Sequence, residues 1–486
     1  MGDWLKWGRV IDLFWSVVRV PGFGLIRGRR LRIGPASGPA GVRGAEELAR
    51  ISGTSMRHAL LFGVGSVGDV FPLIAMGRGL HARGWRVTVC ANPVFESFVH
   101  RAGLLFRGLG TVENYERITR NPDLWHPRKG TKTILVDGQA QELIRQQREV
   151  TREFARGLGE RVVAASPLGI GARIAQEELG VPLVTIHLAP IFLRCQQHPP
   201  KLPEGWLPNT MLRLVPRFTY KLVDRITDPW IGPIVEPLRS ESGLPPVKRY
   251  LEGWWNSPDR VLLCFPEWFG PMPERPGQAR HIGFLQHDDS QQGHELDPLW
   301  EFMTGEAPPV VATFGSAMCH ARWLFERLVC ATGDLGRRLV ILSKNAEQVP
   351  YPLPGHVRRV PWAPMGELLP KAGALIHHGG VGTLARALAA GVPQLVIPFA
   401  HDQHDNARRV DWLGCGMEVA PRWASRRRLT RCLASLTENP VIRQKAGTLS
   451  RWVQPHQAVA KACDWMEDTA GRRSVGQSGA PGAAYA

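Results

Sequence analysis

The feature that most constrains the fold is a repeated alternation of short apolar runs with helical segments, which starts at Met56. Parallel strands that are buried on both faces appear as continuous apolar runs, and each crossover between them needs a helix. The alternation therefore predicts an α/β protein with doubly wound parallel sheets. In the first half the expected strands are 58–64, 86–91, 104–108, 182–189 and 261–265. In the second half they are 310–314, 338–342, 357–362, 374–377 and 394–398.

A chain of 486 residues is too long for one hydrophobic core, because single cores rarely grow beyond about 250 residues. We expect two Rossmann-like domains that face each other across a cleft, since open sheets bind ligands at the carboxyl ends of their strands. The expected parts are a basic amphipathic extension (1–55), a first domain (56–290), a linker (291–308), a second domain (309–469) and a disordered tail (470–486).

The chain carries 60 Lys and Arg against 43 Asp and Glu, a formal net charge of +17 that favours anionic partners. The arginines are dispersed and no nucleic-acid-binding signature is apparent, so we expect no nucleic-acid partner. No apolar run approaches the roughly 20 residues of a membrane-spanning helix. The eight cysteines form no CxxC pair, which argues against a zinc ribbon and a disulfide scaffold. These observations together predict a soluble cytoplasmic protein with reduced thiols.

Residues 1–55 differ in composition from the rest. Apolar residues recur there at helical spacing from Trp4 to Val18, and a basic run follows at 27–32. One interpretation is a helix on an anionic membrane surface, which would place the protein at the inner face of the cytoplasmic membrane. Two other interpretations remain open: a helix packed on the protein body, and a true translation start at Met56.

The most informative motif is His377-His378-Gly379-Gly380-Val-Gly382-Thr383, where an expected strand ends in glycines and a helix begins. Successive backbone N–H groups at a helix N-terminus form an anion site, and glycine lets a diphosphate approach them. The His378 side chain adds a donor that strengthens as negative charge develops. The alternative interpretation is a tight turn that only packs helix against strand.

Other polar residues follow neighbouring strands. Ser316 stands at the end of an expected strand and could reach the same phosphates. Asp402 and Gln403 offer an acceptor and a donor suited to sugar hydroxyls. The flanking His401 and His404 also suggest metal ligands, but adjacent loop residues splay apart, so we expect no metal site.

Asp69 lies in a Gly-Asp-x-x-Pro turn at the end of the first strand of the first domain. Desolvation at the cleft would raise the pKa of this carboxyl group, which suits a general base. The alternative interpretation is a helix N-cap, because Asp is favoured there.

Together these residues resemble a family. Its members are the GT-B-fold glycosyltransferases of the UDP-glycosyltransferase (family 1) superfamily, which includes antibiotic glycosyltransferases. The resembling stretches are Gly65-Ser-Val-Gly68-Asp69-Val-Phe-Pro72, Trp362-Ala-Pro364, 377–383, Gly391-Val-Pro393 and 398–406. Within the family, the sequence looks most like the rhamnolipid-type rhamnosyltransferases and related bacterial lipid and sterol glycosyltransferases.

The resemblance implies a role for each residue. Trp362 would hold the nucleotide base, while Asp402 and Gln403 would grip the donor sugar. Asp69 would be the catalytic base, and His378 would assist catalysis by stabilising the leaving diphosphate. The diphosphate would be held by Ser316, His378 and the backbone around Gly379, Gly380, Gly382 and Thr383.

The resemblance also implies the reaction. It is an inverting transfer, without metal or cofactor, of a rhamnosyl or glucosyl group from a UDP- or dTDP-sugar to a hydroxyl of a lipid-like acceptor. We expect the Trp- and Pro-rich stretch 190–255 to line the acceptor site. Arg386 and Met365 depart from the family pattern and leave the choice of nucleotide open. A sugar-nucleotide epimerase of the same fold and a non-catalytic sugar-nucleotide-binding subunit are the alternatives.

Overall fold

The computed structural model describes residues 56–135, 138–203, 207–273, 277–288, 296–316 and 318–476. The predictions for residues 1–55 and for 477–486 lie outside these ranges. Within them, no helix is long and apolar enough to cross a membrane.

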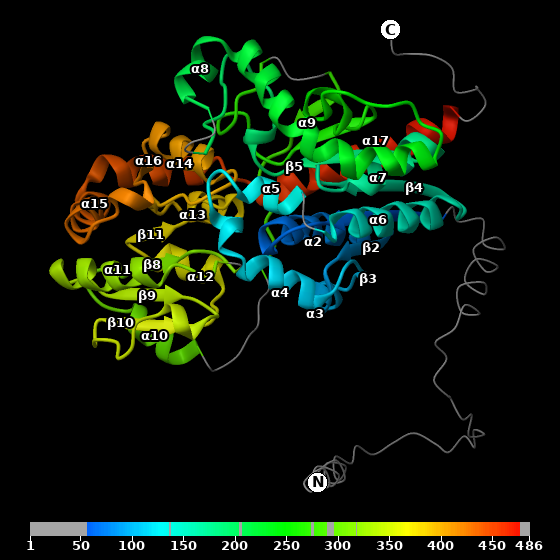
Figure 1. Ribbon diagram of the computed structural model, residues 1–486. Coiled ribbons are helices and arrows are strands. Elements are labelled where there is room, and N and C mark those ends of the chain that lie inside the picture. The colour runs from blue at the N-terminus through cyan, green and yellow to red at the C-terminus, as the bar shows by residue number, and fades with distance from the viewer. Residues whose placement is uncertain are drawn as a thin grey trace, which may run out of the picture. The chain divides into compact units, whose positions relative to one another are not determined.

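The first sheet has seven parallel strands in the order β3-β2-β1-β4-β5-β6-β7 (Figure 1). Its strands are β1 (Arg57–Gly63), β2 (Arg86–Ala91), β3 (Leu105–Gly108), β4 (Glu160–Ala165), β5 (Leu183–His187), β6 (Arg260–Leu263) and β7 (Ala279–His281). The second sheet has six parallel strands in the order β10-β9-β8-β11-β12-β13. Its strands are β8 (Val310–Thr313), β9 (Leu339–Leu342), β10 (Val357–Val360), β11 (Ala374–His377), β12 (Gln394–Val396) and β13 (Gly416–Glu418).

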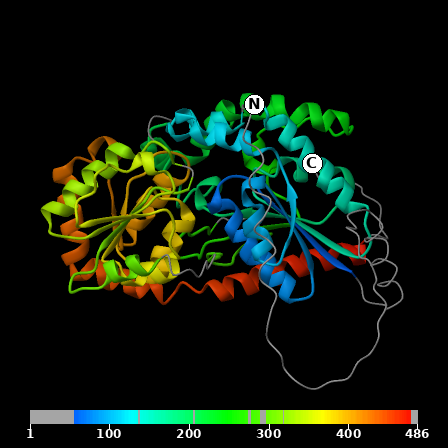
Figure 2. The same ribbon diagram turned by 90° about the horizontal axis from the view of Figure 1, so that it is seen from below.

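The predicted fold class is confirmed, since both sheets are parallel and helices lie between their strands (Figures 1 and 2). In the first half the helices are α2 (Val67–Ala82), α3 (Glu96–Arg101), α4 (Val112–Arg120), α5 (Gly130–Leu135), α6 (Ala140–Ala155), α7 (Ile170–Leu179), α8 (Asn209–Leu214) and α9 (Pro216–Glu241). In the second half they are α10 (Asp297–Met303), α11 (Arg322–Asp334), α12 (Met365–Leu368), α13 (Val381–Ala390), α14 (Gln403–Trp412), α15 (Arg426–Glu438), α16 (Pro440–Ser450) and α17 (Pro455–Gly476).

Three strands escape the sequence prediction: β4, β7 and β13. The most important is β4, because it pairs with β1 and β5 in the middle of the first sheet. Only its last four residues are buried. Its first residues are polar and continue the polar stretch before it, so the sequence shows no clear start of a strand. In the short strands β7 and β13 only the first of three residues is buried, so neither forms an apolar run.

The stretch 190–255 is more regular than its composition suggests, because it contains the 26-residue helix α9. Three prolines inside this helix, Pro229, Pro233 and Pro237, recur every fourth residue and therefore share one exposed face. Water can satisfy the carbonyl groups that lose their helical partners on that face. The opposite face buries Ile231 and Val235 in the core.

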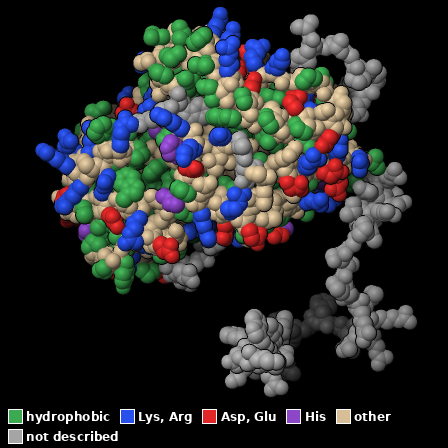
Figure 3. Space-filling view, viewed as in Figure 1, with side chains coloured by type: hydrophobic (Ala, Val, Ile, Leu, Met, Phe, Trp, Pro, Cys, Tyr) green, Lys and Arg blue, Asp and Glu red, His purple; other side chains and the backbone are tan. Residues whose placement is uncertain are grey.

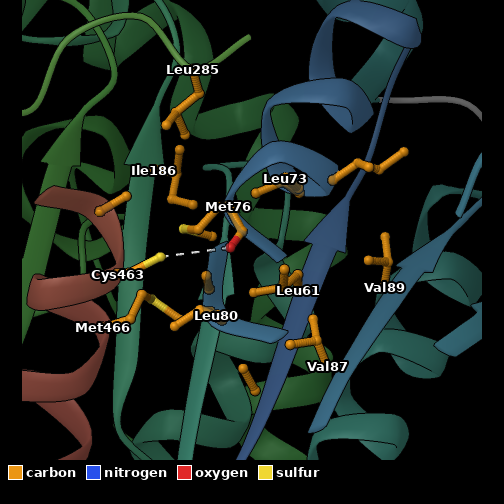
Figure 4. Packing of buried hydrophobic residues seen from close by; sticks show 14 of the residues in the cluster. Leu61, Leu73, Met76, Leu80, Val87, Val89, Ile186, Leu285, Cys463 and Met466 are labelled. Carbon is orange, nitrogen blue, oxygen red and sulfur yellow. Dashed lines mark hydrogen bonds between the residues drawn. The ribbon is translucent and has the colours of Figure 1, made fainter. Parts of the chain in front are cut away.

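Helix α17 follows the second sheet in the chain but packs against the first one (Figures 1 and 2). Cys463 and Met466 are fully buried beside Met76 of α2, and the Cys463 thiol lies 3.8 Å from the Met76 carbonyl oxygen (Figure 4). The structure therefore differs from the predicted domain limits at 469 and 470, because Ala470 is buried and the helix continues to Gly476.

The segment 291–308, expected to be a linker, also differs from its prediction. Helix α10 lies within 291–308, and its Leu299 and Met303 are buried against strands β8 and β9 of the second sheet. A further buried cluster joins the two domains: Phe265 and Phe269, which follow β6, share it with Leu384 of α13 and Val410 of α14. The two sheets consequently form one compact unit.

Candidate active site in the interdomain cleft

The strand orders locate the cleft. The first sheet changes direction between β1 and β4, and the second between β8 and β11. Such switch points open a crevice at the carboxyl ends of the strands. A cavity of about 670 Å³ lies there. Nine of the residues predicted from the sequence line it: Asp69, Ser316, Trp362, His378, Gly380, Gly382, Thr383, Asp402 and Gln403.

Two helix N-termini meet in this cleft. A Cβ atom placed on Gly382 of α13 would lie 3.8 Å from the Cα atom of Gly68 in α2. Both helices follow glycine-containing turns, but only α2 is capped by its own side chains. The N-cap of α13 is Gly380, and no side chain caps this helix. The first N–H groups of α13 are therefore the ones open to an anion.

The His378 imidazole lies between two glycines. A Cβ atom on Gly315 would lie 2.8 Å from His378 Cε1, and one on Gly380 would lie 2.6 Å from His378 Nε2. The side chain is buried, and its Nδ1 atom has no hydrogen-bond partner among the described residues. Burial, and then the nearby His401, lower the pKa of His378 to about 4. The ring is thus neutral at pH 7, and its Nε2 edge lies beside Gly380, the N-cap of α13.

Gly379 is the one predicted residue that does not line the cavity. Its N–H group donates to His377 Nδ1 at 3.1 Å, and its carbonyl oxygen accepts from Asn406 Nδ2 at 2.8 Å. Its φ of +96° favours glycine, and a Cβ atom would lie 2.9 Å from a methyl group of Val396. The geometry therefore argues against a direct contact of Gly379 with a ligand and gives it a role in shaping the turn.

Asp402 and Gln403 are held by the turn that carries them. Gln403 Oε1 accepts from the N–H groups of Phe399 and Ala400 at 2.8 and 3.1 Å. Asp402 Oδ2 accepts from Asn406 Nδ2 at 2.8 Å. Asn406, which the sequence interpretation left without a role, thus binds both this turn and the Gly379 carbonyl. The sequence could have indicated this contact, because residues four apart on a helix lie on the same face.

Asp69 is not the N-cap that its sequence position allowed, but it belongs to the capping structure of α2. Ser66 is the N-cap of α2, and Asp69 is the third residue of that helix in a capping box. Asp69 Oδ2 accepts from the Ser66 N–H at 2.7 Å and from Ser66 Oγ at 3.1 Å. Gly65 makes room for this carboxylate, because a Cβ atom there would lie 2.3 Å from Oδ2. Oδ1 has no donor among the described residues.

Two carboxyl groups, Asp69 and Asp402, interact across the cleft. Burial raises the pKa of Asp69, although the two bonds from Ser66 oppose the shift. Burial, and then the charge of Asp69, raise the pKa of Asp402 to about 7. One carboxyl group comes from each domain, so a hydroxyl-bearing ligand between the domains would meet an acceptor on either side.

The first domain lines its side of the cavity mainly with apolar side chains. Most belong to α4, α5, α6 and the segments beside them: Tyr115, Ile118, Leu124, Trp125, Ile134, Leu135, Leu143 and Ile144. The expectation that 190–255 lines this site is therefore wrong in the main. From the described part of that stretch only Ile234 reaches the cavity, because α9 buries its apolar face against α6 and α7.

His401 connects the second domain to this apolar side. Its φ of +56° is unusual for a residue with a Cβ atom. Its ring lies near the Leu124 carbonyl oxygen and 6.1 Å from the Trp125 ring, edge to face. The sequence suggested His401 only as a metal ligand. Among the described residues, no group of three or more His, Cys, Asp or Glu side chains is arranged to hold a metal ion.

Arg386 also finds its partner on a distant segment. Its Nε donates to Asp288 Oδ1 at 3.0 Å, and its guanidinium also bonds the His287 carbonyl oxygen. The side chain is therefore largely buried and paired with a carboxylate. It fastens the segment that follows β7 to helix α13, next to the half-buried Trp362 and Met365 at the cavity wall.

Comparison with known proteins agrees with this geometry. Residues 59–196 match the glycosyltransferase family 28 N-terminal domain, and residues 326–461 match the C-terminal domain of erythromycin biosynthesis protein CIII-like proteins. O-mycaminosyltylonolide 6-deoxyallosyltransferase of Streptomyces fradiae is 28% identical over 450 residues, which cover 86% of this chain and 99% of that enzyme.

Two solved structures show the same fold. The glycotransferase of kitacinnamycin superposes with a TM-score of 0.66 at 21% identity, covering 86% of this chain and 100% of that one. The glycosyltransferase VinC, solved in complex with DTDP, superposes with a TM-score of 0.58 at 19% identity, covering 85% of this chain and 100% of that one. The two domain matches lie in this order along a chain that shares the GT-B fold of these solved glycosyltransferases.

Proposed function

We propose that the protein transfers a hexosyl group, rhamnosyl or glucosyl, from a dTDP- or UDP-sugar to a hydroxyl of a hydrophobic, lipid-like acceptor. The observation that carries this proposal is the position of two groups across one cleft. The uncapped N-terminus of α13 suits a diphosphate, and the half-buried carboxyl group of Asp69 faces it from the first domain.

The donor would bind against the second domain. The N–H groups at the start of α13 and Nε2 of His378, which lies beside Gly380, would hold the diphosphate. Trp362 would contact the base, and Ser316 would contact the phosphates from the loop after β8. Asp402 and Gln403 would hold the sugar hydroxyls. VinC was solved with DTDP, which makes dTDP-sugars the first donors to test.

The transfer would proceed in one displacement. The Asp69 carboxylate takes the proton of the acceptor hydroxyl, whose oxygen attacks the anomeric carbon. The bond from that carbon to the diphosphate oxygen breaks, and the diphosphate leaves with the electron pair. Attack from the side opposite the leaving group inverts the anomeric centre. We propose that no metal ion is needed, because the dipole of α13 and His378 already stabilise the leaving anion.

The acceptor would occupy the apolar half of the cavity. Its lining from α4, α5 and α6 suits an acceptor that buries a hydrophobic body and leaves a hydroxyl at Asp69. The Streptomyces fradiae relative is named for transfer to O-mycaminosyltylonolide. The acceptors to test should therefore include a 3-hydroxy fatty acid, a sterol and a macrolide aglycone.

Asp69→Asn is the direct test. Asparagine keeps an oxygen for the two bonds from Ser66 but cannot take a proton, so α2 stays capped. We expect transfer to fall by about 10²–10⁴-fold, while the affinity for the nucleotide stays the same. Product formation by mass spectrometry and nucleotide binding by calorimetry measure the two quantities.

Ser66→Ala serves as the matched control. It removes the N-cap oxygen and the hydroxyl bond to Asp69 Oδ2, at a cost of about 1 kcal/mol in stability, but keeps the carboxyl group and its bond from the Ser66 N–H, so transfer should persist. In the wild type the rate should rise with pH through the raised pKa of Asp69, because only the carboxylate form accepts a proton. Near-normal transfer by Asp69→Asn would contradict the proposed role, and loss of nucleotide binding by the same variant would mean that it is misfolded.

A further inference from the structure

The corner between α8 and α9 exposes large apolar side chains. Leu214, Val215 and Phe218 are 80%, 46% and 60% exposed. In Figure 3 hydrophobic side chains gather over α8 and the start of α9, with Lys and Arg side chains beside them. The corner is firmly anchored, because Leu212 and Tyr220 on its inner side are buried. These apolar side chains are therefore presented to the outside by a well-packed element.

Cations accompany this apolar corner. Arg213, Arg217, Lys221 and Arg225 are all exposed on α8 and α9. Among the described residues, none of the four forms an ion pair, and Arg217 bonds only the neutral Gln196. The one acid of α9 that lies among them, Asp224, is buried and paired with Arg194. The surface is thus apolar at its tip and positively charged on its flanks.

We infer that this α8–α9 corner docks on an anionic phospholipid surface. Apolar side chains of an interfacial element enter the headgroup boundary, and Lys and Arg stems reach the phosphates beside them. Each such cation contributes about 1 kcal/mol on an anionic membrane. A second copy of the chain is a poorer occupant, because a two-fold contact would place these unpaired cations against each other.

The corner is also linked to the cleft. The same helix α9 continues from Phe218 to Ile234, which lines the apolar half of the cavity. Sixteen residues of α-helix span about 24 Å. Docking at this corner would hold the acceptor side of the cleft at a fixed distance from the lipid surface. This inference rests on the exposed corner alone and stands whether or not the proposed transfer is correct.

The experiment is co-sedimentation of the full-length protein with phosphatidylcholine vesicles, with and without phosphatidylglycerol. The wild type should bind the anionic vesicles preferentially. A triple variant, Leu214→Ser, Val215→Ser and Phe218→Ser, should bind them at least tenfold more weakly. A second triple variant carries Arg217→Gln, Lys221→Gln and Arg225→Gln. Its affinity for the anionic vesicles should fall about a hundredfold, and its preference for phosphatidylglycerol should disappear.

A matched control changes three exposed apolar residues elsewhere: Trp423→Ser, Val441→Ser and Trp452→Ser, which are 62%, 59% and 55% exposed in the native chain. It should bind like the wild type, and all variants should keep the wild-type unfolding temperature. Unchanged binding by the corner variants would overturn the inference, as would equal losses in the control. A wild-type dimer that the corner variant converts to a monomer would also overturn it, because the occupant would then be a second copy.

Discussion

At the scale of single residues, the cleft depends on side chains whose environment changes their protonation. His378 stays neutral because it is buried between two glycines, and its Nε2 edge lies beside the start of α13. The pKa of Asp402 is raised by its burial and by the charge of Asp69, which belongs to the other domain. The protonation states of the cleft are therefore a property of the assembled pair of domains.

A pH-dependent stability should follow from Asp402. Its pKa is raised to about 7 from 3.8, so its folded form binds a proton more tightly than the unfolded chain does. This group's contribution to the free energy of unfolding is complete below about pH 4 and is lost as pH rises through 7. Asp402→Asn should be as stable as the wild type near pH 4 and more stable by roughly 1–2 kcal/mol at pH 8.

Urea unfolding at several pH values measures this difference. The buried histidines titrate in the opposite direction, but they do so in both proteins and cancel in the comparison. Gln403→Ala, a neighbour on the same turn that carries no charge, is the control and should show a difference that does not vary with pH. A stability gap between Asp402→Asn and the wild type that is the same at pH 4 and pH 8 would contradict the raised pKa.

At the scale of secondary structure elements, α17 shows how one helix can tie two domains together. It follows the second sheet, yet Met466 and Cys463 complete the core beneath α2 of the first (Figure 4). Polar contacts fix the same docking at its edge, where Glu467 pairs with Arg57 and Arg83 and accepts from Trp85 Nε1 at 2.9 Å. The first sheet therefore gains part of its core from the far end of the chain.

Met466→Ala tests this docking. Removing a fully buried methionine side chain should lower the free energy of unfolding by about 2–5 kcal/mol. Lys461→Ala, on the exposed face of the same helix, is the matched control and should change stability by less than about 0.5 kcal/mol. Chemical unfolding followed by circular dichroism measures both. If the two variants were equally stable, α17 would not pack on the first sheet in solution.

At the scale of the whole molecule, the two domains contribute different halves of one site. In the proposed mechanism the second domain supplies the anion site and the turn that would hold the sugar, and the first supplies Asp69 and the apolar wall. Contacts across the cleft, such as that of His401 with Leu124 and Trp125, couple the two halves. A ligand that occupies the cleft should therefore stabilise the molecule as a unit.

Nucleoside diphosphates should raise the unfolding temperature. A single site filled at one hundred times its dissociation constant stabilises the folded state by about 2.7 kcal/mol. We expect such a shift with dTDP or UDP and little with thymidine or uridine at the same concentration, because the start of α13 binds the phosphates. Thermal unfolding with this series would also choose the nucleotide. An equal shift with the free nucleosides would contradict the anion site at α13.

Much of the fold and of the site is encoded locally. Strands that are buried on both faces must be apolar along their length, and a strand that runs through glycines into a helix must leave N–H groups free. These rules act over a few residues. The ten expected strands are therefore present in the structure, and nine of the ten predicted site residues line the cavity. Their individual roles in transfer remain predictions.

The tertiary structure decided what depends on partners far apart in the chain. Arg386 bonds Asp288, Gly379 bonds Asn406, and Arg57 pairs with Glu467 at a separation of 410 residues. The docking of α17 and the placement of α9 behind the cavity are of the same kind. Local periodicity identifies which face of an element is apolar, but the face it meets is chosen by the packing of the entire chain. Local sequence patterns therefore suffice for ten of the strands and for the glycine-rich turns, whereas long-range packing sets which helices form the apolar wall of the cleft.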